Sequence, residues 1–177
     1  MRGFTFSLFC VFVVLLTACH DGQNNPTKTN QAQLKESLEK ANRYLVNDEE
    51  EDINNYVARH KLDMVVTGTG LRYKILQAGT GDSIREGQVV TMDYELRDIK
   101  GDLIYSSKNE GVKSFVVGHG DVESGMDEAV RHLHKGDVAV VIIPSHLGYG
   151  LLGDQKSIPE RSTLVYTLRI NEVDENN

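Results

Sequence analysis

The sequence is poor in cysteine, tryptophan and proline, and it has no run of basic residues. Its 177 residues hold two cysteines, Cys10 and Cys19, three prolines and no tryptophan. Two cysteines cannot build the dense disulfide framework of small secreted domains. A formal net charge of −7 with only isolated Lys and Arg residues argues against a nucleic-acid partner. What remains is the composition of an ordinary globular domain with extra segments.

Motifs for covalent or metal chemistry are also missing. No Gly-x-Ser-x-Gly elbow occurs. His132 and His134 lie two positions apart on a predicted helix, so they point to different faces and do not form a metal pair. Gly118-His119-Gly120 follows a predicted strand but lacks the third glycine and the lysine of a phosphate loop. We therefore expect neither a metal nor a cofactor.

The N-terminus has the pattern of a bacterial lipoprotein signal. Arg2 precedes an apolar run from Phe4 to Leu16, which is too short for a bilayer span of about 20 residues. The run ends in Leu16-Thr17-Ala18-Cys19, which matches a lipobox. We expect residues 1–18 to be removed and Cys19 to be lipidated. The protein would then be anchored to a bacterial membrane in the cell envelope, with its domain periplasmic or surface-exposed. The alternative is an ordinary secretory signal.

Two further segments precede the main domain. Residues 19–29 are polar and predict a flexible tether. Residues 30–62 predict a helical neck, because Leu34, Leu38, Ala41 and Leu45 recur at helical spacing. Asp48 with Glu51 resembles a capping box that starts a second helix. The apolar face of that helix comprises Ile53, Tyr56, Val57 and His60. The neck is either a spacer packed on the domain or a dimerisation element that makes a homodimer.

Residues 63–177 change to a pattern of strands and turns. Alternating β-formers predict strands at residues 71–76, 88–98, 103–105, 113–117, 138–143 and 163–173. Met126, Ala129, Val130 and Leu133 predict one short helix, which we expect Gly136 to end. The fold class is therefore α+β, a mostly antiparallel sheet with one short helix.

One turn in this domain has the features of a pocket rim. The predicted strand Val138–Ile143 meets Pro144, and Tyr149 then lies between Gly148 and Gly150. Flanking glycines suit a backbone with positive φ or a close approach. We interpret Tyr149 as a phenol placed over a binding pocket.

Several motifs stand in a specific order along the domain. They are Gly79-Thr80-Gly81, Gly87-Gln88-Val89-Val90, Gly101 through Tyr105-Ser106-Ser107, Phe115-Val116-Val117-Gly118, Val122-Glu123-Ser124-Gly125-Met126, Lys135-Gly136-Asp137, Ile143-Pro144 through Leu147-Gly148-Tyr149-Gly150, Ile158-Pro159 and Thr163-Leu164-Val165-Tyr166. From Gly79 to Val173 the chain resembles an FKBP-type peptidyl-prolyl cis-trans isomerase. Together with the lipobox, the layout is similar to the gliding-motility-associated isomerase lipoproteins of Bacteroidetes, although motility does not follow from it.

The resemblance implies an FKBP-like twisted antiparallel sheet wrapped on one short helix, preceded by the helical neck. It also implies a proline pocket formed by Tyr94, Tyr105, Phe115, Val122, Glu123, Met126, Tyr149, Ile158 and Tyr166. The Tyr149 hydroxyl and the backbone N–H of Glu123 would contact substrate carbonyls. The proline ring would rest on Met126, against Tyr94, Phe115 and Tyr166.

Three positions depart from the family pattern and bear on function. Met126 stands where tryptophan is usual, Ser106 where aspartate is usual, and Glu123 where an apolar residue is usual. We expect an acidic rim and weakened isomerase activity. The resemblance implies a lipid-anchored isomerase that assists the folding of envelope proteins, with proline-containing polypeptides as clients. The alternative is a non-catalytic FKBP-like binding subunit of an envelope assembly.

Overall fold

The computed structural model describes residues 26–175, with side chains from residue 31 onward. The predicted signal peptide, Cys19 and most of the predicted tether lie outside these residues. The described residues divide into two units, one that ends at Tyr44 and one that begins at Leu45. Among the described helices, none combines the length and apolar character needed to cross a membrane.

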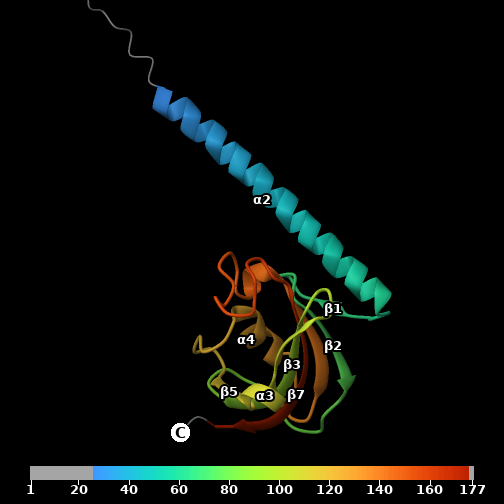
Figure 1. Cartoon of the computed structure of the whole chain (residues 1–177). Helices are drawn as coiled ribbons and strands as arrows, with labels where there is room; N and C mark the ends of the chain where they lie inside the picture. The colour runs from blue at the N-terminus through green and yellow to red at the C-terminus, as the bar shows by residue number, and fades with distance from the viewer. Residues whose placement is uncertain (1–25, 176–177) are drawn as a thin grey trace, which may run out of the picture. The chain divides into compact units, whose positions relative to one another are not determined.

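The neck is one continuous helix. Helix α2 runs from Pro26 to Arg59 (Figure 1). It begins inside the segment predicted as tether, with proline at the first helical position, where its missing N–H costs nothing. The prediction of a second helix starting at Asp48 is wrong. Residues 27–59 contain no glycine or proline, so the acidic stretch does not break the helix.

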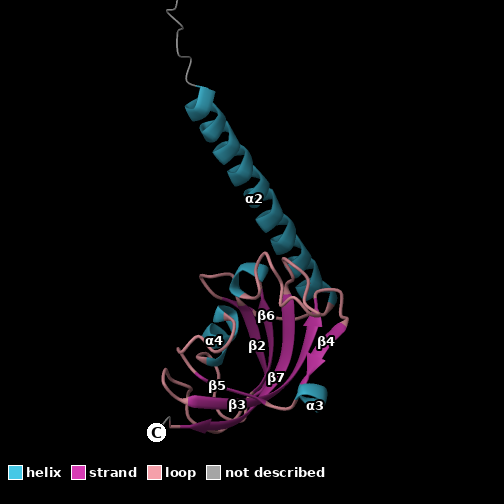
Figure 2. Ribbon diagram, turned by 60° about the vertical axis from the view of Figure 1, so that its left-hand side comes forward, coloured by secondary structure: helices cyan, strands magenta, loops and turns pink. Residues whose placement is uncertain are grey.

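The domain is built on one antiparallel sheet (Figures 1 and 2). Its strands are β1 (Val65–Val66), β2 (Arg72–Gln77), β3 (Val89–Asp98), β4 (Leu103–Ser106), β5 (Lys113–Val116), β6 (Val138–Ile143) and β7 (Leu164–Asp174). Their order is β1-β2-β6-β7-β3-β4, and β5 pairs with the first half of β3. The predicted α+β class is confirmed, and β1 is a short strand that the sequence pattern did not predict.

The main core lies between the sheet and helix α4 (Ser124–Val130), which covers one face (Figure 2). Leu164, Tyr166 and Leu168 alternate along β7 and all point into this core. Helix α4 ends at Val130, with Arg131 as its cap, so Gly136 does not end it as predicted. Gly136 instead has φ +91° in the turn before β6.

The opposite face of the sheet is covered by the second half of α2. Ile53 and Tyr56 are buried against Val140, Ile142 and Val165, which face away from the main core. Strand β6 is therefore covered on both faces, which explains why it is a continuous apolar run rather than an alternating one. The predicted apolar face is confirmed for Ile53, Tyr56 and Val57, but the prediction is wrong for His60, which is exposed and stacks on the Tyr56 ring.

Polar contacts fix the same half of the helix. The Glu49 carboxylate accepts hydrogen bonds from the backbone N–H of Ser145 at 2.7 Å and from the Thr163 hydroxyl at 2.7 Å. The Arg72 guanidinium, on β2, donates to Glu50 and Asn54. Residues 45–59 thus belong to the domain, which begins earlier than the predicted boundary at residue 63.

Candidate functional site

Four tyrosines from distant parts of the sequence surround one cavity of about 550 Å³. Tyr94 comes from β3, Tyr105 from β4, Tyr149 from the turn after β6 and Tyr166 from β7. The Tyr94 and Tyr166 ring centroids lie 6.1 Å apart at an interplanar angle of 52°. We call this space the tyrosine cavity. Its remaining lining residues are Leu96, Glu110, Lys113, Asp154, Lys156 and Ser157.

Tyr149 is placed by the turn that follows β6. After Pro144, the short 3₁₀ helix η2 (Ser145–Leu147) reverses the chain. The Gly150 N–H donates to Ser145 O at 2.9 Å, and the Arg161 N–H donates to Gly150 O at 2.7 Å. Gly150 has φ +59°, as expected, but Gly148 has φ −102°. A Cβ on Gly148 would lie 3.1 Å from Leu164 Cδ1, so its role is close packing.

Glu123 supplies a buried carboxylate behind the cavity wall. The Tyr166 hydroxyl donates to its Oε1 at 2.7 Å, and Lys113 Nζ donates to its Oε2 at 3.3 Å. The Glu123 side chain is only 3% exposed. The expectation of an acidic rim at this position is therefore wrong, because the side chain turns inward toward two donors.

These contacts set the protonation states of the groups around Glu123. Burial opposes ionisation of its carboxyl, but the Lys113 ammonium and the Tyr166 and Tyr149 hydroxyls outweigh burial, so the pKa of Glu123 is lowered. Burial, and then the Glu123 charge, raise the pKa values of Tyr149 and Tyr166 well above their ordinary value. Both phenols therefore keep their protons at neutral pH and remain hydrogen-bond donors.

A second carboxylate, Asp154, organises the loop on the other side of the cavity. The Tyr105 hydroxyl donates to its Oδ2 at 2.5 Å. Its Oδ1 accepts the backbone N–H groups of Lys156 at 2.9 Å and Ile158 at 2.8 Å. Burial opposes ionisation, but these hydrogen bonds outweigh it and lower the pKa of Asp154. The loop that carries Ile158 is thus attached to β4 through Tyr105.

The structure brings only some of the predicted site residues to the cavity surface. Tyr94, Tyr105, Tyr149 and Tyr166 line it. Phe115, Met126 and Ile158 are buried in the main core, and Val122 packs against that core. Met126 has no exposed surface, so it supports the wall from behind and does not form an open floor. Ser106 is buried at the end of β4.

Sequence reasoning missed the charged residues of the cavity. Lys113 and Asp154 take part in the contacts described above, and Glu110 and Lys156 also line the space. Ser106 stands where aspartate is usual in the family pattern. The missing carboxylate could have prompted a search for another acidic residue near the pocket. Among residues 26–175, no group of three or more His, Cys, Asp and Glu side chains is placed to hold a metal ion.

Comparison with known proteins places the chain in a family. The model of the FKBP-type peptidyl-prolyl cis-trans isomerase family matches residues 81–171. The chain is 29% identical over 161 residues to the probable FKBP-type peptidyl-prolyl cis-trans isomerase FkpA of Neisseria meningitidis, an alignment that covers 90% of this chain and 55% of that protein. It is 33% identical over 109 residues to FK506-binding protein 1 of Gibberella zeae, covering 59% of this chain and 98% of that protein.

The fold has a counterpart among solved structures. The crystal structure of AtFKBP13 matches with a TM-score of 0.60 at 24% identity, covering 62% of this chain and 98% of that one. The chain spans about half the length of the Neisseria meningitidis protein. The motif order, the four-tyrosine cavity and the family match over residues 81–171 lead to one conclusion: the chain belongs to the FKBP-type peptidyl-prolyl cis-trans isomerase family.

Proposed function

We propose that this protein catalyses cis-trans isomerisation of X–Pro bonds in polypeptide clients. The observation that carries the proposal is the tyrosine cavity, in which four rings from β3, β4, the turn after β6 and β7 enclose a space of about 550 Å³. A proline ring with its neighbouring peptide groups fits a space of this size. The Tyr149 hydroxyl keeps its proton and adds a hydrogen-bond donor to the cavity wall, whereas the Tyr166 hydroxyl is already donated to Glu123.

The mechanism requires no covalent step. Rotation about an X–Pro bond crosses a barrier of roughly 18–20 kcal/mol that arises from amide resonance. The planar amide is more polar than the twisted amide. Moving the X–Pro amide from water to the apolar faces of the tyrosine rings therefore favours the twisted state. The Tyr149 hydroxyl keeps its proton and can donate to a substrate carbonyl as that carbonyl rotates. Glu123 helps to fix the surrounding side chains through Tyr166 and Lys113.

A protease-coupled isomerisation assay tests this function. The chain from Pro26 to Asn177 is added to an Ala-Pro peptide whose trans form alone is cleaved. We expect the slow phase, which takes tens to hundreds of seconds without catalyst, to accelerate in proportion to protein concentration. A slow phase identical to that in buffer would reject the proposed catalysis.

A second candidate is a non-catalytic binding subunit of an envelope assembly. It is favoured by the charged groups of the cavity and by the burial of Met126, which leaves no open apolar floor. This candidate predicts that proline peptides bind to the protein while the isomerisation rate stays at that of buffer. Peptide binding measured beside the coupled assay separates the two functions.

We further propose that Cys19 carries a lipid and that the protein helps envelope proteins to fold at a bacterial membrane. The support is the lipobox Leu16-Thr17-Ala18-Cys19. In a bacterial host, metabolic labelling with a palmitate analogue should mark the wild-type protein and not Cys19→Ala. In a detergent phase-separation experiment, the wild-type protein should enter the detergent phase and Cys19→Ala should stay in the aqueous phase. Equal labelling of both forms would place the lipid elsewhere, and no labelling would favour an ordinary secretory signal.

The neck is proposed either as a spacer or as the element of a homodimer. Leu34 and Leu38 are each 60% exposed on α2, which is the apolar surface that a helix partner would cover. Light scattering on chains starting at Pro26 and at Leu45 decides between the two roles. If the longer chain is a dimer and the shorter chain a monomer, the neck is a dimerisation element. If both chains are monomers, the neck is a spacer.

A further inference from the structure

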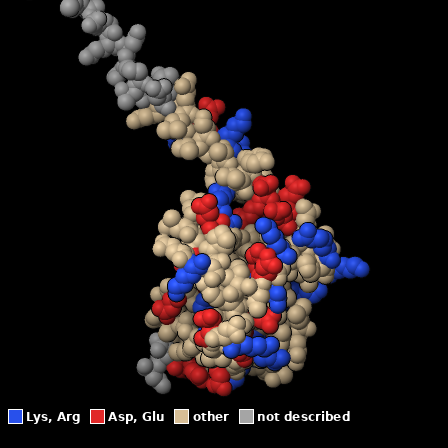
Figure 3. Space-filling view, in the orientation of Figure 1, with Lys and Arg blue, Asp and Glu red and all other residues tan. Residues whose placement is uncertain are grey.

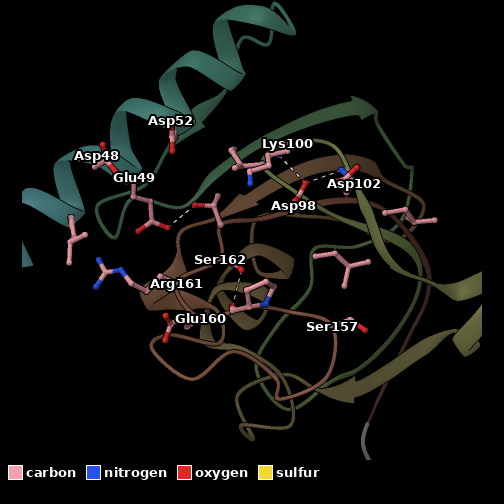
Figure 4. Close-up of a pocket in the computed structure, with 16 residues that line it drawn as sticks. Asp48, Glu49, Asp52, Asp98, Lys100, Asp102, Ser157, Glu160, Arg161 and Ser162 are labelled. Carbon is pink, nitrogen blue, oxygen red and sulfur yellow. Dashed lines mark hydrogen bonds between the residues drawn. The ribbon is translucent and has the colours of Figure 1, made fainter.

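A second cavity adjoins the tyrosine cavity and has a different character. Its volume is about 600 Å³, and all of its lining residues belong to the unit 45–177. Its walls are the second half of α2, the turn between β3 and β4, and residues 157–163 (Figure 4). We call it the acidic groove. Its residues are Leu45, Asp48, Glu49, Asp52, Asp98, Ile99, Lys100, Asp102, Leu103, Ile104, Ser157, Pro159, Glu160, Arg161, Ser162 and Thr163.

Acidic groups outnumber basic groups in this groove. Six side chains carry carboxylates, whereas Lys100 and Arg161 are its two cations. Glu49 is committed to Ser145 and Thr163, and Asp98 accepts the backbone N–H groups of Lys100 and Asp102. Figure 4 shows Asp48, Glu49 and Asp52 along the helix, and Asp98 and Asp102 on the turn across from it. Acidic atoms also gather on the side of the molecule where this part of the helix lies (Figure 3).

Asp48 and Asp52 differ from Glu49 and Asp98, whose carboxylates accept hydrogen bonds from other groups of the domain. Both side chains are exposed, and within the described range neither makes a hydrogen bond or ion pair to another residue. They lie four residues apart, so they occupy the same face of α2. Asp102 and Glu160 are also exposed and, among residues 31–175, without such a partner, so four of the groove's carboxylates are free to meet a ligand.

Apolar side chains complete the groove surface. Leu45 is 37% exposed and Leu103 is 47% exposed, and Ile99, Ile104 and Pro159 line the same space. Lysine and arginine place an aliphatic stem on apolar surface while the charged end stays near water or acids. A surface that joins exposed leucines to carboxylates therefore suits a basic side chain better than a bare metal ion or an acidic one.

The groove adjoins the tyrosine cavity. Leu103 and Ile104 line the groove, and the next residue on β4, Tyr105, lines the tyrosine cavity. Ser157 lines both spaces. An extended chain advances about 3.3–3.6 Å per residue. A polypeptide whose proline lies among the tyrosines therefore reaches the groove within a few residues.

We propose that the acidic groove binds the segment of a client polypeptide that flanks the isomerised proline, and that it selects lysine or arginine there. The inference rests on the proposed function, because it assigns a preferred client sequence to the same site. Asp48 and Asp52 receive the basic end of the client side chain, and Leu103 contacts its stem.

The test uses matched fluorescent peptides with one Ala-Pro bond. Each carries lysine, norleucine or glutamate at one position, two to four residues before or after the proline. Binding to the chain 26–177 is measured by anisotropy, and isomerisation is measured by the coupled assay. On one side of the proline, the lysine peptide should bind about two- to five-fold more tightly than the norleucine peptide at low salt. Salt of about 1 M, where the Debye length is about 3 Å, should remove that preference.

Two charge-matched variants locate the effect. Asp48→Asn/Asp52→Asn should weaken the lysine preference, although Asp102 and Glu160 keep their charges in the groove. Glu172→Gln/Asp174→Asn removes the same charge from exposed positions on β7, outside both cavities, and should keep the preference. Far-UV circular dichroism and thermal unfolding confirm that both variants are folded. If both variants lose the preference equally, net charge and not the groove is responsible.

Failure of this inference is distinguishable from failure of the proposed function. Equal binding of lysine and norleucine peptides at every position overturns the groove assignment while isomerisation continues. A lysine preference that Asp48→Asn/Asp52→Asn leaves undiminished overturns it as well. Buffer-level isomerisation of all peptides rejects the catalysis, and the anisotropy data still decide whether the groove selects lysine.

Discussion

The Glu123 carboxylate lies under the wall of the tyrosine cavity, where it replaces an apolar side chain of the family pattern. A buried charge is costly unless it is paired and hydrogen-bonded. Here Lys113 supplies the opposite charge, and Tyr166 supplies a second donor at 2.7 Å. Lys113 itself is 26% exposed and lines the cavity, so a buried anion holds a cation at the cavity surface.

Glu123 should make the stability of the domain depend on pH. Its pKa is lowered from 4.5 in the folded state, so its contribution is fully present above about pH 4.5 and is lost as pH falls through the folded value. Glu123→Gln keeps an acceptor for Tyr166 but cannot ionise. We expect the stability difference between wild type and Glu123→Gln to shrink as pH falls below 4.5. Denaturant unfolding from pH 7 to pH 3 measures it.

The difference between wild type and Glu123→Gln reports on Glu123 alone. Asp93 and Asp154 also have lowered pKa values, but they titrate in both forms and their effect cancels. A stability difference that stays constant from pH 7 to pH 3 would mean that Glu123 does not gain stability from its charge.

Tyr149→Phe should reduce kcat/KM by about two- to ten-fold, the range expected for one hydrogen bond of modest net strength. The phenylalanine ring still shields the substrate amide from water, so most of the desolvation effect is retained. Tyr73→Phe is a matched control, because Tyr73 stacks on His132 and does not line the tyrosine cavity. Complete loss of activity in Tyr149→Phe would assign the hydroxyl a larger role than desolvation.

The candidate site could be predicted as a set of positions but not as a set of charges. The tyrosines were found because the family motifs fix their order in the sequence. The inward orientation of Glu123 could not be predicted, because its partners Tyr166 and Lys113 lie 43 and 10 residues away and nothing in its local sequence reveals them. Asp154 was missed for the same reason, since Tyr105 is 49 residues away.

At the scale of elements, the second half of α2 is the outer cover of the sheet. Ile53→Ala should lower the free energy of unfolding by about 2–5 kcal/mol, because Ile53 is 1% exposed against Ile142 and Val165. Leu38→Ala, on the first half of the same helix, should change it by no more than about 0.5 kcal/mol, because Leu38 is 60% exposed. Chemical denaturation of both variants provides the comparison, and similar losses would contradict the assigned packing.

Strands were easier to predict than helix boundaries. Successive side chains of β3 and β7 point to opposite faces of the sheet, one more buried than the other. The resulting alternation of apolar and polar residues can be read from a few neighbouring positions. The ends of α2 and α4 depend on weaker forces. Asp48 and Glu51 offered a plausible cap, but capping contributes only about 1 kcal/mol, and the burial of Ile53 and Tyr56 maintains a continuous helix.

At the scale of the molecule, the folding unit begins at Leu45. A chain starting at Leu45 should unfold at nearly the same temperature as one starting at Pro26. A chain starting at Leu62 loses Ile53 and Tyr56 and exposes Val140 and Ile142, so it should lose about 3–6 kcal/mol. Calorimetry of the three chains tests the boundary. Equal stability of all three would show that the helix cover is dispensable.

The position of β7 also has a consequence for biosynthesis. The last strand of the chain lies between β6 and β3, and Asp174 pairs with Val89, which is synthesised 85 residues earlier. Such long sequence separations slow folding, because a large loop must close before its contacts form. Before β7 emerges, β3 has no partner on that side and the wall residue Tyr166 is absent. A nascent chain of this protein therefore stays open until β7 has been synthesised, and only then gains the cavity with which we propose it acts on other chains.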